Sequence, residues 1–307
     1  MNLGDLLTIH HPLAARDRHI AVFYLHGGGL LYGERDDLPQ PYIRQLTDAG
    51  YTLICADYPL APESSLPQIV DAAFETWQAA VAEPQAAGEY KAHFLFGRSA
   101  GAYLSLLLAR KIGRLEDMPQ PAGILDFYGY HTITDAAFSQ PAKAYARLPE
   151  VTRSQVDKLA GDGSRMVTTG PKPLRYALYV YARQHEGAWL DLMGLGGDDP
   201  IHSPDAWSLT DDEAVQLPPL FITASSGDED VPFRLSKALS RMAPRAVKKP
   251  VYHLPHDFDR DVSDPAGAKA YTQAIEWMDA IAGPERPAWP SGPASLVNCT
   301  PKLGRLK

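Results

Sequence analysis

The pentapeptide Gly97-Arg98-Ser99-Ala100-Gly101 constrains the fold of this chain more than any other stretch. It directly follows the apolar run Phe94-Leu95-Phe96, and the apolar residues after it recur at the spacing of one helix face: Tyr103, Leu104, Leu107, Leu108 and Ile112. The pattern predicts a strand, a sharp turn and a helix, with Ser99 at the apex of the turn. Glycines suit both sides of such a turn because the backbone comes close enough there for a Cβ to collide. A Gly-x-Ser-x-Gly turn in this setting lifts the serine hydroxyl above the carboxyl edge of a sheet, where it can act as a nucleophile.

Composition sets limits on the class of protein. The chain has 307 residues, 45% of them hydrophobic, which is ample for the core of one large domain or of one domain with an insertion. A formal net charge of -8, with no basic run, argues against a nucleic-acid partner. The two cysteines, Cys55 and Cys299, lie far apart and imply no disulfide framework. Cys55 stands in an apolar run, which predicts a buried thiol.

The N-terminal residues give no sign of a targeting segment. Residues 1–5 lack the charged-then-apolar pattern of a signal peptide, and no apolar run approaches membrane-spanning length. We therefore expect a cytoplasmic protein with no membrane span. The sequence predicts no cofactor and no bound metal, and it leaves the oligomeric state open, a homodimer included.

Strand-like and helix-like runs alternate along the chain. Several of the strand-like runs are continuously apolar, as expected for central strands that helices cover on both faces. The pattern predicts an α/β fold with a mostly parallel sheet. The predicted strands are residues 6–10, 20–25, 52–56, 93–96, 123–127, 219–224 and 250–254, and the predicted helices are residues 42–49, 67–82, 100–113, 231–242 and 266–282.

One long segment interrupts this alternation. Residues 129–216 contain no clear strand, but helix-like stretches occur at 152–159 and 174–185, and several tyrosines and tryptophans supply apolar surface. A bare loop of that length is rare in a compact domain. We therefore predict a core formed by residues 1–128 and 217–283 and a mainly helical lid at 129–216. Residues 284–307 are rich in Pro and Gly and are expected to form an irregular tail.

A second glycine-rich stretch, His26-Gly27-Gly28-Gly29, follows the predicted strand 20–25. Three consecutive glycines indicate that the backbone must approach another group closely. Their N–H groups, together with that of Ala100, can form an oxyanion hole for an oxygen that becomes negative during reaction. A flexible loop or a phosphate-binding loop is the alternative, but neither the P-loop pattern nor Gly-x-Gly-x-x-Gly is present.

These motifs together carry a family resemblance. His26-Gly27-Gly28-Gly29, then Asp57-Tyr58-Pro59-Leu60-Ala61-Pro62-Glu63, then Gly97-Arg98-Ser99-Ala100-Gly101 resemble, in that order, the hormone-sensitive-lipase-like branch of the α/β-hydrolase superfamily. The resemblance covers about residues 18–282 and is firmest in the first half. It implies an α/β-hydrolase fold and a carboxylesterase or lipase with a Ser-Asp-His triad. It also implies that Gly28 and Gly29 supply the oxyanion N–H groups.

The chain departs from that family in two respects: the residues around the serine turn and the length of the N-terminal region. Arg98 stands where the family has Asp, and Ala102 stands where it has a second Gly. The region ahead of His26 is also short, which predicts a more open or differently built lid. The first departure leaves the chemistry intact but makes the substrate harder to specify.

The rest of a triad is expected in the second half, in the order acid and then histidine. Ser225-Ser226-Gly227-Asp228-Glu229-Asp230-Val231-Pro232 resembles the family's acid loop, in which the carboxylate lies three residues ahead of Val-Pro. This spacing favours Asp228. Asp230 remains the rival, although we expect it to face solvent or the start of the next helix.

His256 follows the last predicted strand on a loop, as in the family's His-x-Phe, whereas His253 falls inside that strand. We therefore predict His256 as the general base. The stretch Asp257-Phe258-Asp259-Arg260-Asp261 begins like a calcium loop, but Val262 and Ala268 replace the required Gly and Glu.

We therefore predict a serine hydrolase that acts on small or medium carboxylic esters. The predicted catalytic residues are Ser99, Asp228 and His256, and the predicted oxyanion donors are Gly28, Gly29 and Ala100. The predicted substrate-binding residues are His26, Gly27, Arg98 and Tyr128. Hydrolysis of amides, carbamates or lactones is an alternative for the same triad, and a non-catalytic ligand-binding protein on the same fold is another.

Overall fold

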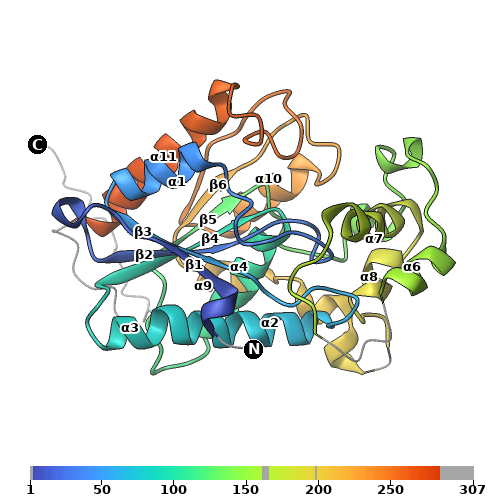
Figure 1. The fold of residues 1–307 in the computed structure, drawn as a ribbon, viewed down its shortest axis with the longest axis horizontal. Helices are drawn as coiled ribbons and strands as arrows, with labels where there is room; N and C mark the ends of the chain where they lie inside the picture. The colour runs from blue at the N-terminus through green and yellow to red at the C-terminus, as the bar shows by residue number, and fades with distance from the viewer. Residues whose placement is uncertain (1–2, 161–165, 198, 284–307) are drawn as a thin grey trace, which may run out of the picture.

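A seven-stranded sheet forms the centre of the molecule (Figure 1). The computed structural model describes residues 3–160, 166–197 and 199–283. The strand order is β1-β3-β2-β4-β5-β6-β7; β1 pairs antiparallel with β3, and all other neighbours are parallel. The strands are β1 (Leu7–His10), β2 (Ile20–Leu25), β3 (Tyr51–Ala56), β4 (Ala92–Arg98), β5 (Gly123–Phe127), β6 (Leu220–Thr223) and β7 (Ala246–Lys248).

Helices cover both faces of the sheet, so its central strands are buried on both sides. Figure 1 shows α1 (Gln40–Asp48) and α11 (Pro265–Ala282) together on one face and α2 (Leu66–Trp77) on the other. Along β2, Phe23 and Leu25 belong to the core under α2 and α4 (Ala100–Ile112), whereas Val22 and Tyr24 belong to the core under α1 and α11. All six residues of β2 are buried, which explains its continuous apolar run.

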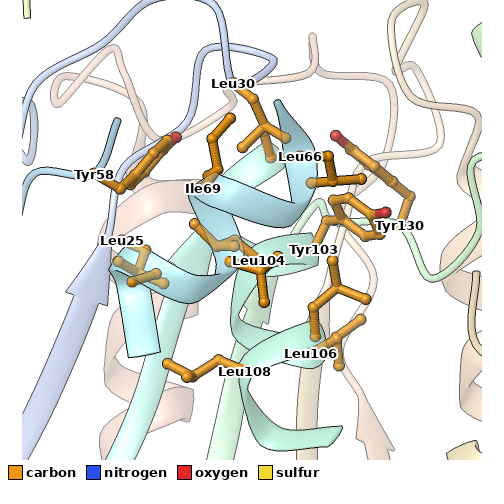
Figure 2. Packing of buried hydrophobic residues seen from close by; sticks show 14 of the residues in the cluster. Leu25, Leu30, Tyr58, Leu66, Ile69, Tyr103, Leu104, Leu106, Leu108 and Tyr130 are labelled. Atoms are coloured by element: carbon orange, nitrogen blue, oxygen red, sulfur yellow. The ribbon is translucent and has the colours of Figure 1, made fainter. Parts of the chain in front are cut away.

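The core between α2 and α4 supports the start of α4. Figure 2 shows Leu66 and Ile69 of α2 together with Leu104 of α4 in this cluster. Nearby, the rings of Tyr103 and Tyr130 stack with centroids 4.7 Å apart. Every residue from Ala100 to Ala109 is buried, so the helix that begins after Ser99 is held in place by packing.

Residues 129–216 contain helices and no strand within the part that the structure describes. Figure 1 shows α6, α7 and α8 grouped at one end of the strands. The remaining α-helices are α3 (Glu83–Ala86), α5 (Ala136–Ser139), α6 (Arg153–Leu159), α7 (Lys172–Gln184), α8 (Ala188–Leu192), α9 (Asp211–Gln216) and α10 (Phe233–Met242). The short helical turns are η1 (Leu3–Leu6), η2 (Ala14–Arg16), η3 (Gln78–Ala82), η4 (Tyr145–Arg147), η5 (Pro200–His202) and η6 (Pro204–Trp207).

The predicted fold class is confirmed, and six of the seven predicted strands match observed strands within a few residues. The seventh prediction, at 250–254, is wrong because β7 lies earlier, at Ala246–Lys248. As the edge strand, β7 is only partly covered and carries a charged residue, so it lacks the apolar run of a central strand. Beyond it, the N–H of Val251 still donates to Ala224 O at 3.0 Å, and Pro250 has no N–H to contribute.

The remaining expectations concern Cys55, the tail and membrane insertion. Cys55 is buried, as predicted, with 1% of its surface exposed. Cys299 and the predicted irregular tail at 284–307 lie outside the described residues. None of the helices described has the length and apolar character needed to cross a membrane.

Candidate active site

Ser99 lies at the sharp turn between β4 and α4, with φ 54° and ψ -120°. Gly97 and Gly101 flank this turn, and neither position has space for a side chain. A Cβ on Gly97 would lie 2.1 Å from Gly101 O, and a Cβ on Gly101 would lie 2.0 Å from Leu25 O. Only glycine fits at both positions, and the resulting strained turn holds Ser99 at the carboxyl edge of the sheet.

Ser99, His256 and Asp228 form a chain of hydrogen-bonded side chains across three loops. Ser99 Oγ lies 2.8 Å from His256 Nε2, and His256 Nδ1 lies 2.6 Å from Asp228 Oδ2. The other carboxylate oxygen, Asp228 Oδ1, accepts the N–H groups of Asp230 and Val231, both at 2.8 Å. These backbone bonds fix the carboxylate, so it orients the imidazole toward Ser99.

The environment of His256 favours its protonated form. Burial by itself lowers the pKa of this imidazole, but the Asp228 carboxylate, through its charge and its hydrogen bond, raises it. Asp230 and Asp257 add smaller effects in the same direction, and the resulting pKa is about 9. The site therefore stabilises the imidazolium form of His256.

The glycine loop after β2 lies beside the serine. Gly28 and Gly29 have φ of 104° and 61°, a region that favours glycine. A Cβ on Gly28 would lie 1.9 Å from Tyr32 O, and one on Gly29 would lie 2.2 Å from the Tyr179 ring. Within the described residues, no protein acceptor is found for the N–H of Gly28 or Gly29.

Two further residues complete this side of the site. Ala100 is the first residue of α4, so its N–H lies outside the hydrogen-bond ladder of the helix. A Cβ on Gly27 would lie 3.3 Å from Ser99 Cβ, so Gly27 keeps the loop close to the serine.

His26 was predicted to bind substrate, and its surroundings contradict that role. Its side chain is completely buried and stacks on the Tyr58 ring, with centroids 4.2 Å apart and planes 14° from parallel. Its Nδ1 lies 2.8 Å from Gly27 O, and the Tyr58 hydroxyl donates to His26 O. His26 therefore supports the glycine loop from behind and cannot contact a substrate.

Arg98 and Tyr128 were also predicted to bind substrate, and both side chains are buried instead, with 6% and 2% exposed. Successive residues of a strand point to opposite sides, so Arg98 points away from the face that Ser99 presents. Arg98 Nε donates to the Tyr128 hydroxyl at 2.5 Å, and its NH2 group donates to Asp259 Oδ1 at 2.9 Å.

Asp259 was not predicted to have any role, because its sequence setting resembled only an incomplete calcium loop. Its side chain has no exposed surface and pairs with Arg98. No group of three or more His, Cys, Asp or Glu side chains in the described residues could hold a metal ion. The sequence signal for the pair is indirect: a buried arginine at the end of an apolar strand needs a buried carboxylate nearby.

Asp230 was expected to face solvent or the next helix, and this expectation is wrong. Its carboxylate accepts the hydroxyls of Tyr145 at 2.9 Å and Tyr179 at 2.8 Å, and it lies 3.2 Å from Arg183 Nε. All three partners belong to the segment 129–216, so Asp230 connects the acid loop with that segment. It makes no contact with His256 comparable to that of Asp228.

A family model for the alpha/beta hydrolase fold matches residues 22–229, a range that includes the glycine loop, the Ser99 turn and Asp228. The chain belongs to this family. The α/β-hydrolase membership that the sequence motifs implied is thereby confirmed. The observed sheet, with its antiparallel first strand and six parallel strands, is the architecture expected of an α/β hydrolase.

Two solved structures are similar over most of their length. An alpha/beta hydrolase superfamily protein from Enterococcus faecalis is 32% identical, with 89% of this chain and 94% of that chain covered and a TM-score of 0.75. A protein of unknown function from Staphylococcus aureus is 30% identical, with 90% and 94% covered and a TM-score of 0.77.

A curated relative, ethyl acetate hydrolase from Pseudomonas putida, is 29% identical over 123 residues. The match covers 40% of this chain and 38% of the relative's own length. It relates this chain to an ester hydrolase over that part only.

Proposed function

We propose that this protein is a serine hydrolase that cleaves small or medium carboxylic esters through an acyl-enzyme on Ser99. The observation that carries the proposal is the continuous hydrogen-bonded chain from Ser99 through His256 to Asp228. A serine hydroxyl is a weak nucleophile until a base removes its proton, and His256 Nε2 lies within reach to do so.

The proposed reaction has two stages. Ser99 Oγ attacks the ester carbonyl and gives its proton to His256, which then protonates the departing alcohol as the acyl-enzyme forms. Water next gives a proton to His256 and attacks the acyl carbon, and the same proton returns to Ser99 Oγ as the acid leaves. Asp228 stays ionised throughout, holding the Nδ1–H tautomer and stabilising the imidazolium.

The oxygen of the attacked carbonyl becomes negative in both stages. We propose that the N–H groups of Gly28, Gly29 and Ala100 bind it, because no competing acceptor for them occurs in the part of the chain that the structure describes and they lie beside the serine turn. Such donors act more strongly on the transition state than on the substrate, since only the former carries the full charge.

We further propose that residues 129–216 form a lid that limits substrate size. The Tyr179 ring of α7 packs against Gly29, and Tyr145 reaches the acid loop through Asp230. Two aromatic side chains from this segment therefore stand close to the proposed reaction centre. The likeness to an enzyme named for ethyl acetate, a small ester, supports a preference for short acyl chains.

Ser99→Ala tests this function. The substitution removes one oxygen atom, so we expect an unchanged circular dichroism spectrum and a fall in kcat by about 10⁴-fold or more. Turnover should be measured with p-nitrophenyl esters of rising chain length, from acetate to laurate. Ester turnover by the variant within tenfold of wild type would contradict the proposal, and a preference for the longest chains would contradict the lid's role.

A further inference from the structure

A buried cluster of charged and hydroxyl groups lies directly beneath the serine and the histidine. We define the Arg98 cluster as the set of side chains that hydrogen-bond in succession around that guanidinium. Its members are Arg98, Asp259, Tyr128, Tyr271, Asp37 and Tyr24. They come from β2, β4, α11 and loops at the carboxyl edge of the sheet, so the cluster connects segments distant in sequence.

Both charges at the centre of the cluster are well compensated. Asp259 Oδ1 accepts from Arg98 at 2.9 Å and from the Tyr128 hydroxyl at 2.7 Å. Its other oxygen accepts the Tyr271 hydroxyl at 2.9 Å, and Arg98 NH1 lies 3.4 Å from Asp37. A buried ion that loses its partner is strongly destabilising, so the arrangement tolerates little displacement of either charge.

The two central residues lie next to the proposed catalytic residues in sequence. Arg98 immediately precedes Ser99, and Asp259 closes the turn that begins at His256. The Arg98–Asp259 pair therefore joins the same two loops that the Ser99–His256 hydrogen bond joins. A displacement of the histidine loop that lengthened the catalytic hydrogen bond would also pull Asp259 away from Arg98.

Tyr128 contacts both the pair and the histidine. Its hydroxyl accepts from Arg98 and donates to Asp259. Its ring meets the His256 ring nearly edge-on, with centroids 4.8 Å apart and planes at 64°. The backbone of Tyr128 is held at φ 46°, and its N–H donates to Thr223 O at 2.6 Å. Its ring is therefore a fixed surface against which the imidazole rests.

We propose that the Arg98–Asp259 pair, bridged by the Tyr128 hydroxyl, is a positioning device that keeps His256 at hydrogen-bond distance from Ser99 and Asp228. This inference rests on the proposed function and deepens it. None of the three residues touches substrate; they act by fixing the histidine loop relative to the serine turn. Arg98, which precedes Ser99, thus acts on His256, the partner of the nucleophile, and not on the substrate.

A purely stabilising role would predict a different result. Removing one partner of any buried ion pair destabilises the fold because the other charge stays buried without compensation, so loss of stability alone does not distinguish the two roles. Arg175–Glu63 provides a matched comparison, because its side chains are equally buried, at 7% and 6% exposed, and 2.7 Å apart. Glu63 contacts none of the residues proposed for catalysis.

The test compares Asp259→Asn and Tyr128→Phe with the control Glu63→Gln. Asp259→Asn removes the charge and keeps the shape, and Tyr128→Phe removes the bridging hydroxyl and keeps the ring against His256. Measurements are the thermal midpoint, kcat and KM for p-nitrophenyl acetate, and the low-field proton NMR signal of His256 Nδ1–H bonded to Asp228. The rate of Ser99 labelling by a fluorophosphonate gives a reading that needs no natural substrate.

Positioning predicts a fall in kcat and in labelling rate for Asp259→Asn of about 10- to 100-fold, the loss typical of a catalytic group misplaced by about 1 Å. KM should change less than about threefold, and the NMR signal should broaden or disappear. Tyr128→Phe should show the same pattern more weakly. Glu63→Gln should lower the thermal midpoint but keep the signal and keep kcat within about threefold of wild type.

The proposal is overturned if folded Asp259→Asn and Tyr128→Phe keep kcat within twofold and retain the signal. It is also overturned if Glu63→Gln loses as much kcat as Asp259→Asn, because the loss would then follow stability. Should Asp259→Asn fail to fold, Tyr128→Phe decides alone. If wild type neither hydrolyses esters nor reacts with the fluorophosphonate, the proposed function fails. The NMR signal of His256 Nδ1–H then tests positioning separately: its loss in the two variants supports the positioning role, and its persistence overturns it.

Discussion

Two pairs of loops meet at the carboxyl edge of the sheet, and they are built on different principles. In the first half of the chain, the glycine loop and the serine turn are fixed by close backbone approach; an added Cβ at Gly28, Gly97 or Gly101 would lie about 2 Å from a backbone oxygen. In the second half, the acid loop and the histidine loop are fixed by side chains, with Asp228 bonded to His256 and Asp259 to Arg98. The first pair presents backbone N–H groups, and the second presents a carboxylate and an imidazole.

This difference predicts how each half fails. Substitutions of the glycines in the first half add atoms where no space exists and displace N–H donors. The binding of negative charge should therefore weaken. Loss of the Asp228–His256 contact in the second half leaves the backbone intact and should interrupt proton transfer, so the fold should survive better than the activity. The predictions below test this contrast in order of expected effect.

Asp228→Asn should have the largest effect of these changes. The amide keeps the shape of the carboxylate but favours the wrong imidazole tautomer, so kcat should fall by about 10⁴-fold. Circular dichroism should show an unchanged fold, and steady-state kinetics with p-nitrophenyl acetate measures the loss. A variant that is folded and retains a tenth of wild-type kcat would show that Asp228 does not orient His256.

Gly28→Ala should damage the first pair of loops. The new Cβ would lie 1.9 Å from Tyr32 O, so the loop must shift and its N–H groups move with it. Loss of one oxyanion donor lowers kcat by about 10²- to 10³-fold, with a much smaller rise in KM. An effect confined to KM would mean that the loop shapes substrate binding and does not stabilise the transition state.

The pH profile should report the His256–Asp228 interaction. His256 must be neutral to accept the Ser99 proton, and its pKa is raised to about 9, so kcat/KM should rise with pH to a plateau above that value. About one molecule in a hundred then has a neutral His256 at pH 7, and about half do at pH 9. We therefore expect kcat/KM to rise about 50-fold between these two pH values.

The same raised pKa has a consequence for stability. The stabilisation from the His256–Asp228 interaction is fully present below the unfolded pKa of about 6.5 and is lost as pH rises through about 9. In Asp228→Asn, the pH at which kcat/KM reaches half of its plateau should be lower. The thermal midpoint of this variant should also lose the pH dependence described above. A wild-type kcat/KM that stays constant between pH 7 and pH 9 would contradict this account of His256.

Asp230→Asn should have the smallest effect on catalysis, less than tenfold on kcat, because Asp230 bonds to neither Ser99 nor His256. The substitution should lower the free energy of unfolding by about 1–3 kcal/mol, since the Asp230 carboxylate accepts two tyrosine hydroxyls and lies 3.2 Å from Arg183. Chemical denaturation measures the change. If Asp230→Asn were the crippled enzyme and Asp228→Asn the active one, the assignment of the acid would be reversed.

Sequence analysis was most successful where local rules decide the structure. The continuous apolar run of β2 located that central strand to the residue, because both of its faces are buried. The turn at Ser99 was likewise predictable from its glycines, since local sterics alone require them. The edge strand β7 was misplaced because a partly exposed strand needs no such apolar pattern.

Contacts between distant segments were harder to predict. Asp228 could be selected over Asp230 only by a family spacing rule, and nothing in the sequence indicated that Asp230 accepts hydroxyls from Tyr145 and Tyr179. Arg98 was predicted to bind substrate, but it pairs with Asp259, which lies 161 residues away. Pairings of this kind depend on which loops the fold brings together, which local patterns do not specify.

The most direct test of the central claim is covalent labelling with a fluorophosphonate followed by peptide mass spectrometry. The account predicts one adduct per chain, on Ser99, and a labelling rate that falls steeply in Asp228→Asn because His256 no longer activates the hydroxyl. Ser99→Ala should acquire no adduct. An adduct on a different residue, or equal labelling of Ser99→Ala and wild type, would contradict the assignment of Ser99 as the nucleophile.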